Sequence, residues 1–467
     1  MAQDNSYYIK KISESAVEAK YEDIDGAMIR NAKNRILDLL GCALVGAKGP
    51  GSEGMANLVK SWGGKEESTV FVFGGKVPAL NAAMANSAIT RTYDFEAIGA
   101  FVEGVDLASH VSVTTVLTAL AMAEAHGANG KELLASLLVG DDVASRLLSA
   151  SFDADGKNFD KGWDGNGTAN AFGATAIAGR MLGLTKEQMQ HAFGIVMNQL
   201  GGSFQNIWDA SLCFKLPNAL SARNGIFSAE LAKAGWDGPQ DAYFSKFGYF
   251  GLFTDGCANA DILTKDIGKT FYAEATIKPY SCCRANHGAI DCAVNMVAEN
   301  NFEAEAIDEI ILRASPGLRN GFVGQEFKLR VTPQVDAAFS VRFNVANVLL
   351  RKSSRVEHFQ EERIREPGIA RLANMVRFED LAPDEIGKFS VALTVKLKDG
   401  SVFNSGIKFV RGGPFENSFT DDDIKNKFRN NLLATKVISV DSGEKIIELV
   451  DNLEKMDSID ELAKLMV

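Results

Sequence analysis

The sequence predicts a mainly helical protein with a second, smaller α+β domain. From about residue 21 to residue 251, apolar residues recur at helical spacing and no strand pattern of comparable quality competes with them. Near residue 270 the pattern changes to short alternating apolar runs, which are typical of strands. Helical spacing returns after Pro414 and continues to Leu465. A chain of 467 residues also exceeds one ordinary hydrophobic core, so two domains are expected.

The first helical part is predicted over residues 1–268. Apolar residues spaced three to four apart indicate one helix face at Ile29, Ala32, Ile36 and Leu40. Residues 109–125, rich in Leu and Ala, predict a second helix that ends at Gly127. Gly183 indicates a helix end, and the spacing of Thr185 and Gln188 indicates a capping box that begins the next helix.

The α+β domain is predicted over residues 269–412, as a lid on the helical part. Its expected strands are residues 271–277, 307–314, 391–397 and 402–410, with a turn at Asp399-Gly400 joining the last two. Its expected helices are residues 284–299 and 333–350. Residues 413–467 are predicted to return to the first domain. A cleft between two domains is the usual place for a small-molecule site.

Charge and hydropathy exclude several classes of partner. The net charge of −11 disfavours binding to nucleic acid and to anionic membranes. No apolar run approaches the ~18 residues that a membrane-spanning helix needs. Residues 1–11 are polar and lack the apolar core of a signal peptide, so a cytoplasmic protein is expected. A local cationic pocket can still hold a small anion, because its field dominates at short range.

The cysteines and loops predict no metal and no cofactor. Six cysteines without an export signal favour free thiols, and no pair has CxxC spacing. Cys282 and Cys283 are adjacent, which is a poor spacing for two ligands of one metal. The glycine-rich loop over residues 162–168 lacks both the GxGxxG pattern and a following lysine, so it is a weak phosphate loop and an ordinary start for a helix.

Two of the five histidines are candidates for chemistry. His126, His191 and His358 fit a helix end, an amphipathic helix and a solvated charged stretch, respectively. His110 lies at the start of the helix expected over residues 109–125, where the positive end of the helix dipole favours a neutral imidazole that can act as a base. Simple capping of that helix is an equal alternative.

The second candidate, His287, lies in the densest polar segment of the chain, residues 278–287. Arg284 and His287 share a face of the first turn of a predicted helix, where free backbone N–H groups also point. Cations beside such donors favour a carboxylate site, although a phosphate site or a surface Lys/Arg pair would fit the same pattern. Lys215 stands alone in an apolar run, so it either extends to solvent or is held in a site.

Nucleophilic catalysis has little support. No G-x-S-x-G motif accompanies a serine, so Ser/His/Asp chemistry is disfavoured. A cysteine nucleophile at Cys282 or Cys283, paired with His287, is a weak alternative.

Ordered segments along nearly the whole chain resemble the 2-methylcitrate dehydratase / cis-aconitate decarboxylase (MmgE/PrpD) family. They begin with RILDLLGCALVGA at residues 35–47 and the Pro-Ala stretch at residues 78–94. The most specific segment is residues 110–146, which begins HVSVTTVLTALAMAEAHGANG. Four further features follow in order: GWDGNGTANAFGATAIAGRMLGLT, the lysine at residue 215, KPYSCCRANHGAID and the C-terminal GGPFENSFTDDDIKNKF.

The resemblance implies a large helical domain with a smaller lid, a homodimer, and a metal-free site between the domains. It implies proton abstraction next to a carboxylate, followed by loss of water or carbon dioxide. The catalytic residues it implies are Asp94, His110, Lys215, Lys278 and His287. His110 and His287 would transfer protons and Asp94 would orient a histidine. Asp164, Thr168 and Arg284 are the expected substrate-binding residues.

The sequence departs from the family pattern at three places. The segment after Asp94 reads Phe-Glu-Ala where a second aspartate is usual, and the loop from Asp94 to His110 is longer. Asp164 also replaces a histidine in the Gly-(Trp/Phe)-His loop. An acid at that position should weaken the binding of a tricarboxylate, unless Asp164 points away and pairs with Lys161.

These observations favour a cofactor-independent lyase, a dehydratase or decarboxylase, that acts on a small di- or tricarboxylate. An epimerase or isomerase could use the same acid and base. A non-catalytic carboxylate-binding relative is a third hypothesis, which only the change at Asp164 supports.

Overall fold

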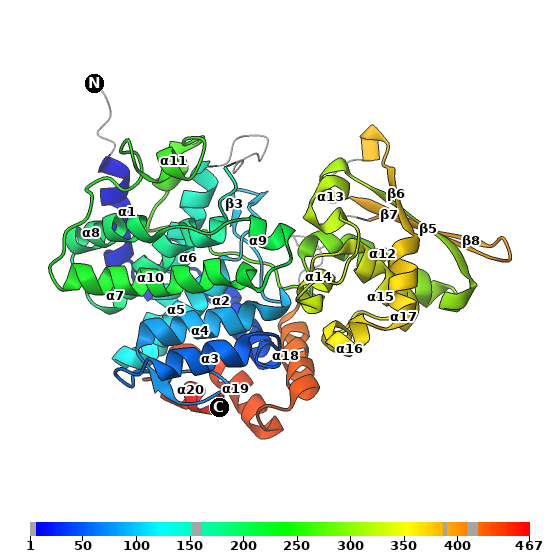
Figure 1. The fold of residues 1–467 in the computed structure, drawn as a ribbon. Coiled ribbons are helices and arrows are strands. Elements are labelled where there is room, and N and C mark those ends of the chain that lie inside the picture. Colours follow the sequence, from blue (N-terminus) through cyan, green and yellow to red (C-terminus); the bar gives the residue numbers. More distant parts are fainter. Residues whose placement is uncertain (1–5, 152–160, 386–389, 409–418) are drawn as a thin grey trace.

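A computed structural model describes residues 6–151, 161–385, 390–408 and 419–467. It shows a large helical domain beside a smaller domain that carries a sheet (Figure 1). The predicted fold class, mainly helical with a second α+β domain, is therefore confirmed. In these ranges no helix has both the length and the apolar character that crossing a bilayer requires.

The large domain is built around helices rich in small residues. Its helices are α1 (Ser6–Glu18), α2 (Gly26–Gly46), α3 (Ser52–Ser61), α4 (Ala79–Thr90), α5 (Val111–His126), α6 (Gly130–Ser151), α7 (Ala169–Met181), α8 (Lys186–Val196), α9 (Gln205–Trp208), α10 (Leu216–Lys233) and α11 (Tyr249–Leu252). Helix α7 packs against α5, α6 and α10. A Cβ atom on Gly140 of α6 would lie 2.7 Å from the Gly173 carbonyl oxygen of α7, so the close packing of these helices requires glycine.

Several predicted helix boundaries are confirmed. Gly127 ends α5 in the left-handed conformation, with φ of 61°. Thr185 caps α8 through a capping box with Gln188, in which each side chain accepts from the other residue's backbone N–H. These bonds satisfy N–H groups that have no partner inside the helix.

Two short ribbons correct the expectation that the first part of the chain contains no strand. The first pairs β1 (Ser68–Thr69) with β2 (Lys76–Val77). The second pairs β3 (Phe101–Val102) with β4 (Val105–Asp106), inside the long loop between Asp94 and His110. Each strand has only two residues, so no alternating pattern could have identified it.

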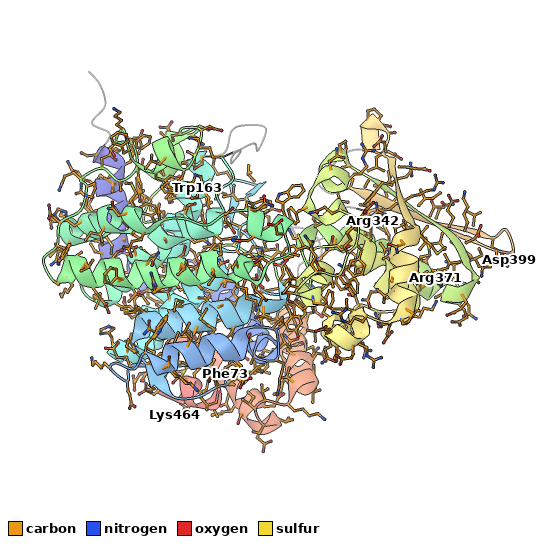
Figure 2. The ribbon with its side chains drawn as sticks, in the orientation of Figure 1. Phe73, Trp163, Arg342, Arg371, Asp399 and Lys464 are labelled. Carbon is orange, nitrogen blue, oxygen red and sulfur yellow. The ribbon has the colours of Figure 1, made fainter. Side chains whose placement is uncertain are left out.

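The smaller domain holds a four-stranded mixed sheet in the order β6-β5-β7-β8. Strands β5 (Ile307–Ala314), β7 (Val391–Leu397) and β8 (Val402–Lys408) occur where strands were predicted, although residues 409–410 lie outside the described residues. Asp399, at the far end of the sheet in Figure 2, marks the predicted turn. Strand β6 (Val376–Asp380) was not predicted, and it pairs in parallel with β5.

Two predicted elements of this domain are wrong. Residues 271–277 form irregular chain with one isolated bridge, from Thr276 to Ile98. Phe271, Ala273 and Ile277 are buried in alternation against the helical core, which produces a strand-like pattern without a neighbouring strand. The helix expected at residues 333–350 is two helices, α14 (Pro333–Ala338) and α15 (Val341–Arg351), because Ser340 caps α15 through the Phe343 N–H.

The remaining helices surround the sheet and close the chain. In the smaller domain they are α12 (His287–Glu299), α13 (Pro316–Asn320), α16 (Glu361–Ile364) and α17 (Pro367–Met375). The chain ends with α18 (Asp421–Thr435), α19 (Val440–Asp451) and α20 (Asp460–Leu465), and α18 packs on α2 as the predicted return to the first domain requires. The domain boundary predicted at 412/413 lies outside the described residues.

One buried lysine ties this returning helix to the loop that follows α4. The Lys427 ammonium lies 2.6 Å from Asp38 Oδ1 on α2 and donates to the Phe95 carbonyl. It also lies 3.8 Å from the centre of the Phe95 ring, where cation–π attraction adds to the contact. The loop that this lysine holds carries Asp94 and Glu96.

We expect Lys427→Met to lower the free energy of unfolding by about 3–5 kcal/mol, because it leaves the Asp38 carboxylate buried without a counter-charge. Denaturant titration measures the change. Lys425→Met on the same helix is the matched control, since Lys425 pairs with the half-exposed Asp451 and should contribute less than about 1 kcal/mol. Equal losses in the two variants would contradict the role of the buried pair.

Candidate active site

The site is organised by the short segment that follows α4. A 3-10 turn over Arg91–Tyr93 leads to Asp94, whose φ of 50° is left-handed. The Arg91 guanidinium pairs with the Asp94 carboxylate, and its Nη1 atom lies 2.9 Å from Glu96 Oε1. All three side chains are at most 1% exposed, so this is a buried ion-pair cluster.

Lys278, which lies 184 residues after Asp94 in the sequence, also contacts this cluster. Its ammonium lies 2.9 Å from Asp94 Oδ1 and donates to the Asp94 carbonyl at 2.7 Å. It also donates to the Cys282 carbonyl at 3.4 Å. Burial by itself would raise the pKa of Asp94, but the charges of Arg91 and Lys278 outweigh it and lower that pKa. Asp94 is therefore an anion with two cationic partners.

His110 lies at the start of α5, but its side chain does not cap the helix. Instead its backbone is clamped: the His110 N–H donates to Asn166 Oδ1 at 2.9 Å, and the His110 carbonyl accepts from Asn218 Nδ2 at 2.9 Å. The capping alternative is therefore excluded, and the imidazole is free to face the cluster.

The imidazole of His110 lies between two carboxylates. Its Nδ1 is 2.7 Å from Glu96 Oε1, and its Nε2 is 3.5 Å from Asp94 Oδ1. Burial, followed by the charges of Arg91 and Lys278, lowers the pKa of His110 well below its ordinary value. The ring is therefore neutral at physiological pH, which is the form that accepts a proton.

Lys215 lies at the end of a 3-10 turn that leads into α10. Its ammonium donates to the Pro50 carbonyl at 2.6 Å and to Thr92 Oγ1 at 3.0 Å. Among the described residues no carboxylate lies within ion-pairing distance of it. Burial, and then the charge of Arg91, lowers the pKa of Lys215 to about 7. The site thus contains one buried cation whose charge has no counter-charge.

Arg284 and His287 flank the start of α12, as their spacing predicted. Arg284 lies in a 3-10 turn and pairs with Asp106 of the β3–β4 ribbon. His287 Nε2 lies 3.3 Å from the Cys282 carbonyl, which Lys278 also contacts. Burial, and then Lys278, lowers the pKa of His287 to about 3. His287 therefore contacts the loop that holds Lys278, whereas His110 contacts the carboxylates directly.

Asp164 and Thr168 occupy different surroundings. Asp164 is 3% exposed, accepts from the Asn166 N–H at 2.9 Å, and lines a cavity of about 280 Å³. Trp163, labelled on the large domain in Figure 2, lines the same cavity. The cavity is otherwise lined by Leu107, Ala108, Ser109, Leu148, Gly162, Gly165, Asn166 and Phe204. Thr168 is fully buried, bonds to the Gly165 carbonyl, and does not reach the cavity wall.

The alternative in which Asp164 pairs with Lys161 is excluded. The Lys161 ammonium donates to the Thr254 carbonyl at 2.7 Å and lies 3.7 Å from Asp255. Burial raises the pKa of Asp164, and its hydrogen bond with Asn166 and the charge of Arg91 act in the opposite direction.

Sequence reasoning missed part of this arrangement. Glu96 was noted only as a departure from a family pattern, and Arg91, Asp106, Asn166 and Asn218 were not singled out. Arg91 had a usable signal, because it follows the apolar helix α4 much as Lys215 stands in an apolar run. Asn166 and Asn218 had no such signal in the sequence, because they are distant from His110 along the chain and contact it only in the folded structure.

Three ligand-type atoms, from Asp94, Glu96 and His110, lie within 4.8 Å of one another. Such a group could in principle hold a metal ion. Here Arg91 already contacts both carboxylates and Lys278 contacts one, so an added cation would face two buried positive charges. The arrangement fits an internally neutralised ion-pair cluster better than a metal centre.

The cysteine-nucleophile alternative is disfavoured by burial. Burial raises the pKa of Cys283 to about 11 and that of Cys282 well above its ordinary value. The thiolate is the nucleophilic form, so neither thiol is activated.

The other histidines lie elsewhere. His126 is exposed, as predicted, and His191 Nδ1 accepts from the Gly238 N–H at 3.4 Å. His358 is half-buried and accepts from the Arg355 N–H at 3.4 Å, so the expectation of a solvated side chain is wrong.

Comparison with known proteins yields two family matches that together span most of the chain. The MmgE/PrpD N-terminal domain matches residues 10–260, and the MmgE/PrpD C-terminal domain matches residues 280–455. Similar proteins include the cis-aconitate decarboxylase-like protein oryM of Aspergillus oryzae, 25% identical, covering 96% of this chain and 95% of that protein. The cis-aconitate decarboxylase of Mus musculus is 26% identical, covering 96% of this chain and 91% of that protein. The cis-aconitate decarboxylase of Homo sapiens is 25% identical, covering 98% of this chain and 95% of that protein.

The thiols offer a test of the site that needs no substrate. We expect iodoacetamide to alkylate Cys213, which is exposed, much faster than Cys282 or Cys283, whose pKa values burial raises. Peptide mass spectrometry at pH 8 measures each rate, and Cys213→Ser should remove the fast phase. Rapid alkylation of Cys283 in the folded protein would revive the nucleophile alternative.

Proposed function

This chain belongs to the MmgE/PrpD family, and from that premise we propose that it is a metal- and cofactor-independent lyase acting on a small di- or tricarboxylate. The observation that carries the proposal is a buried His110 beside the Asp94–Lys278 ion pair, with Lys215 bound to Thr92 of the same segment. Proton abstraction next to a carboxylate needs a base, and cations that stabilise the charge that develops. Two of the similar proteins are named cis-aconitate decarboxylases, and these names support a carboxylate as the substrate.

His110 is the proposed base. Its clamped backbone fixes where the ring stands, and its neutral form can accept a proton from a carbon next to a carboxylate. In a dehydration, the electron pair left on that carbon would expel the hydroxyl group of the adjacent carbon, which takes a proton and leaves as water. In a decarboxylation, the carbon that releases carbon dioxide would keep the electron pair of the broken C–C bond and take up a proton, which a protonated His110 would deliver. Asp94 would position the ring and Lys278 would balance the charge of Asp94.

Lys215 and Arg284 are the proposed anion-binding groups. The Lys215 ammonium contacts only neutral oxygens, so a substrate carboxylate would supply the counter-charge that it lacks. Arg284 is already paired with Asp106, so a substrate would share it with that carboxylate.

For His287 the contacts support a positioning role rather than the proton transfer expected from the sequence. Its Nε2 faces the Cys282 carbonyl, which also receives a hydrogen bond from Lys278. A fixed Cys282 carbonyl keeps the lysine directed at Asp94. His287 would thus act through Lys278.

The substrate would carry an uncharged or cationic group at the end that faces Asp164. The cavity lined by Asp164 contains no lysine or arginine among its lining residues, and its walls are largely apolar. An ionised Asp164 would repel a second carboxylate. A homodimer, which the resemblance implies, and a cytoplasmic location complete the proposal.

The decisive experiment follows a panel of di- and tricarboxylates by NMR in deuterated water, with and without EDTA. Net loss of water or carbon dioxide supports a lyase. Solvent exchange at carbon without net loss would indicate an epimerase instead, and saturable binding without either would indicate a binding protein. Loss of turnover in EDTA that one specific metal restores would refute the metal-free part of the proposal.

We expect His110→Gln to lower kcat by about 10²–10⁴-fold, which is the usual contribution of a general base. His287→Gln should lower kcat by less than about tenfold, since the new amide can still donate to the Cys282 carbonyl. Steady-state assays on the best substrate of the panel measure both, with His126→Gln on the surface as control. A large loss in His287→Gln would return proton transfer to that residue.

Lys215 predicts how affinity depends on pH. Below pH 7 the side chain is protonated and attracts a carboxylate, and above pH 7 it becomes neutral. We therefore expect kcat/KM to fall as pH rises from 7 to 9, by at most about tenfold per unit. Lys215→Arg, which stays charged, should flatten the profile. An unchanged slope in that variant would assign the titration to another group.

Asp164 predicts specificity. A carboxylate about 4 Å from a substrate carboxylate repels it by on the order of 1–4 kcal/mol. We expect wild-type kcat/KM to be lower for 2-methylcitrate and cis-aconitate than for dicarboxylates with hydroxyl, amide or amino groups, and Asp164→His to reverse that order. Asp164→Asn separates charge from shape. A wild type that prefers 2-methylcitrate, with no change in Asp164→His, would contradict the prediction.

A further inference from the structure

We infer that Glu96 is a positioning residue that holds the His110 imidazole in its Nδ1–H tautomer and leaves Nε2 as the proton acceptor. The catalytic consequence rests on the proposed function, but the tautomer does not. Glu96 follows Asp94 by two residues, and its side chain is fully buried.

The first step is the contact itself. Glu96 Oε1 lies 2.7 Å from His110 Nδ1, which is within hydrogen-bonding distance. In the present orientation the N–H direction misses Glu96 Oε1 and Nδ1 has no hydrogen-bond partner, so the ring must rotate before the two groups form a hydrogen bond. One proton therefore belongs to this pair, either on the imidazole or on the carboxyl.

The second step places that proton on the histidine. Arg91 Nη1 donates to the same Glu96 Oε1 at 2.9 Å, which stabilises the carboxylate form. A protonated Glu96 would leave the buried guanidinium with less counter-charge. The ring nitrogen that faces Glu96 is then the donor, and the carboxylate is the acceptor.

The third step concerns the other ring nitrogen. His110 Nε2 lies 3.5 Å from Asp94 Oδ1, too far for a good hydrogen bond, and Arg91 and Lys278 already occupy that carboxylate. Nε2 consequently keeps its lone pair. The charged groups that face the ring are Arg91, Asp94, Glu96, Lys278 and, at longer range, Arg284.

The chemical consequence follows from these contacts. When Nε2 accepts a proton from the substrate, the electron pair of the broken C–H bond stays on carbon and the ring becomes an imidazolium. The carboxylate of Glu96 then stabilises the new charge through Nδ1–H. Release of the proton from Nε2 to water or to the leaving group regenerates the neutral ring. Partners that orient a reactive histidine in this way contribute about 10–100-fold.

The backbone explains why Glu96 is needed. Asn166 and Asn218 fix the main chain of His110, but neither contacts its ring. The polar contacts of the ring are those of its two nitrogens, to Glu96 and Asp94. Glu96 makes the shorter of the two contacts, so it decides the orientation.

The test is two-bond ¹H–¹⁵N correlation NMR on the full-length protein labelled with ¹⁵N-histidine, with the His110 signal assigned from its loss in His110→Gln. We expect Nδ1–H in the wild type and in Glu96→Asp, which keeps the charge, and a tautomer mixture in Glu96→Ala. In parallel, kcat should fall about 10–100-fold in Glu96→Ala and be largely restored in Glu96→Asp. Glu124→Gln, at a buried glutamate that contacts Thr69 and Lys76 instead, is the matched control and should change neither signal.

An Nε2–H tautomer in the wild type would overturn the inference, and so would a Glu96→Ala variant with an unchanged tautomer. The wild-type spectrum decides the matter even if Glu96→Ala does not fold. The proposed function fails separately: an Nδ1–H tautomer in a protein that turns over no carboxylate would uphold the role of Glu96 and refute the lyase.

Discussion

The ion pair between Asp94 and Lys278 is the contact on which the rest of the site depends. Asp94 follows α4 of the large domain, while Lys278 precedes the first helix of the smaller domain, so their 2.9 Å contact links segments 184 residues apart. Both side chains are at most 1% exposed. Burial makes such a pair costly to break, because removal of either partner leaves an unpaired charge in a medium of low dielectric constant. The same contact fixes the carboxylate beside which His110 stands.

Around this pair the protein balances most of its buried charges internally. Arg91 serves both Asp94 and Glu96, Arg284 pairs with Asp106, and Lys427 pairs with Asp38. Lys215 is different, since its described contacts are to neutral oxygens and its pKa is lowered to about 7. A buried charge without a counter-charge lowers the stability of the fold. Such uncompensated groups with shifted pKa values are common at functional sites, including binding sites for anions.

The sequence predicted what periodicity and unusual residues can show. Helical spacing identified the large domain, alternation identified β5, β7 and β8, and a lysine in an apolar run identified Lys215. Alternation failed at residues 271–277, because a chain that lies on a helical core can alternate in burial without a partner strand. Glu96, Asn166 and Asn218 could not be predicted as partners of His110, since contacts between remote loops depend on tertiary structure.

The two ends of the proposed site differ in charge. Arg91 and Lys278 contact Asp94, and Lys215 contacts Thr92 in the same segment. The cavity at Asp164, in contrast, is lined by Trp163, Phe204 and other side chains without a positive charge. Ser109 and Asn166 lie on that cavity wall and also adjoin His110, since Asn166 Oδ1 accepts from both the Ser109 hydroxyl and the His110 N–H. A substrate would thus place a carboxylate toward Lys215 and a less acidic end toward Asp164, with the carbon that loses its proton near His110. In the proposed function, orientation by unlike ends, rather than by a ring of cations, would distinguish this site from one built for three carboxylates.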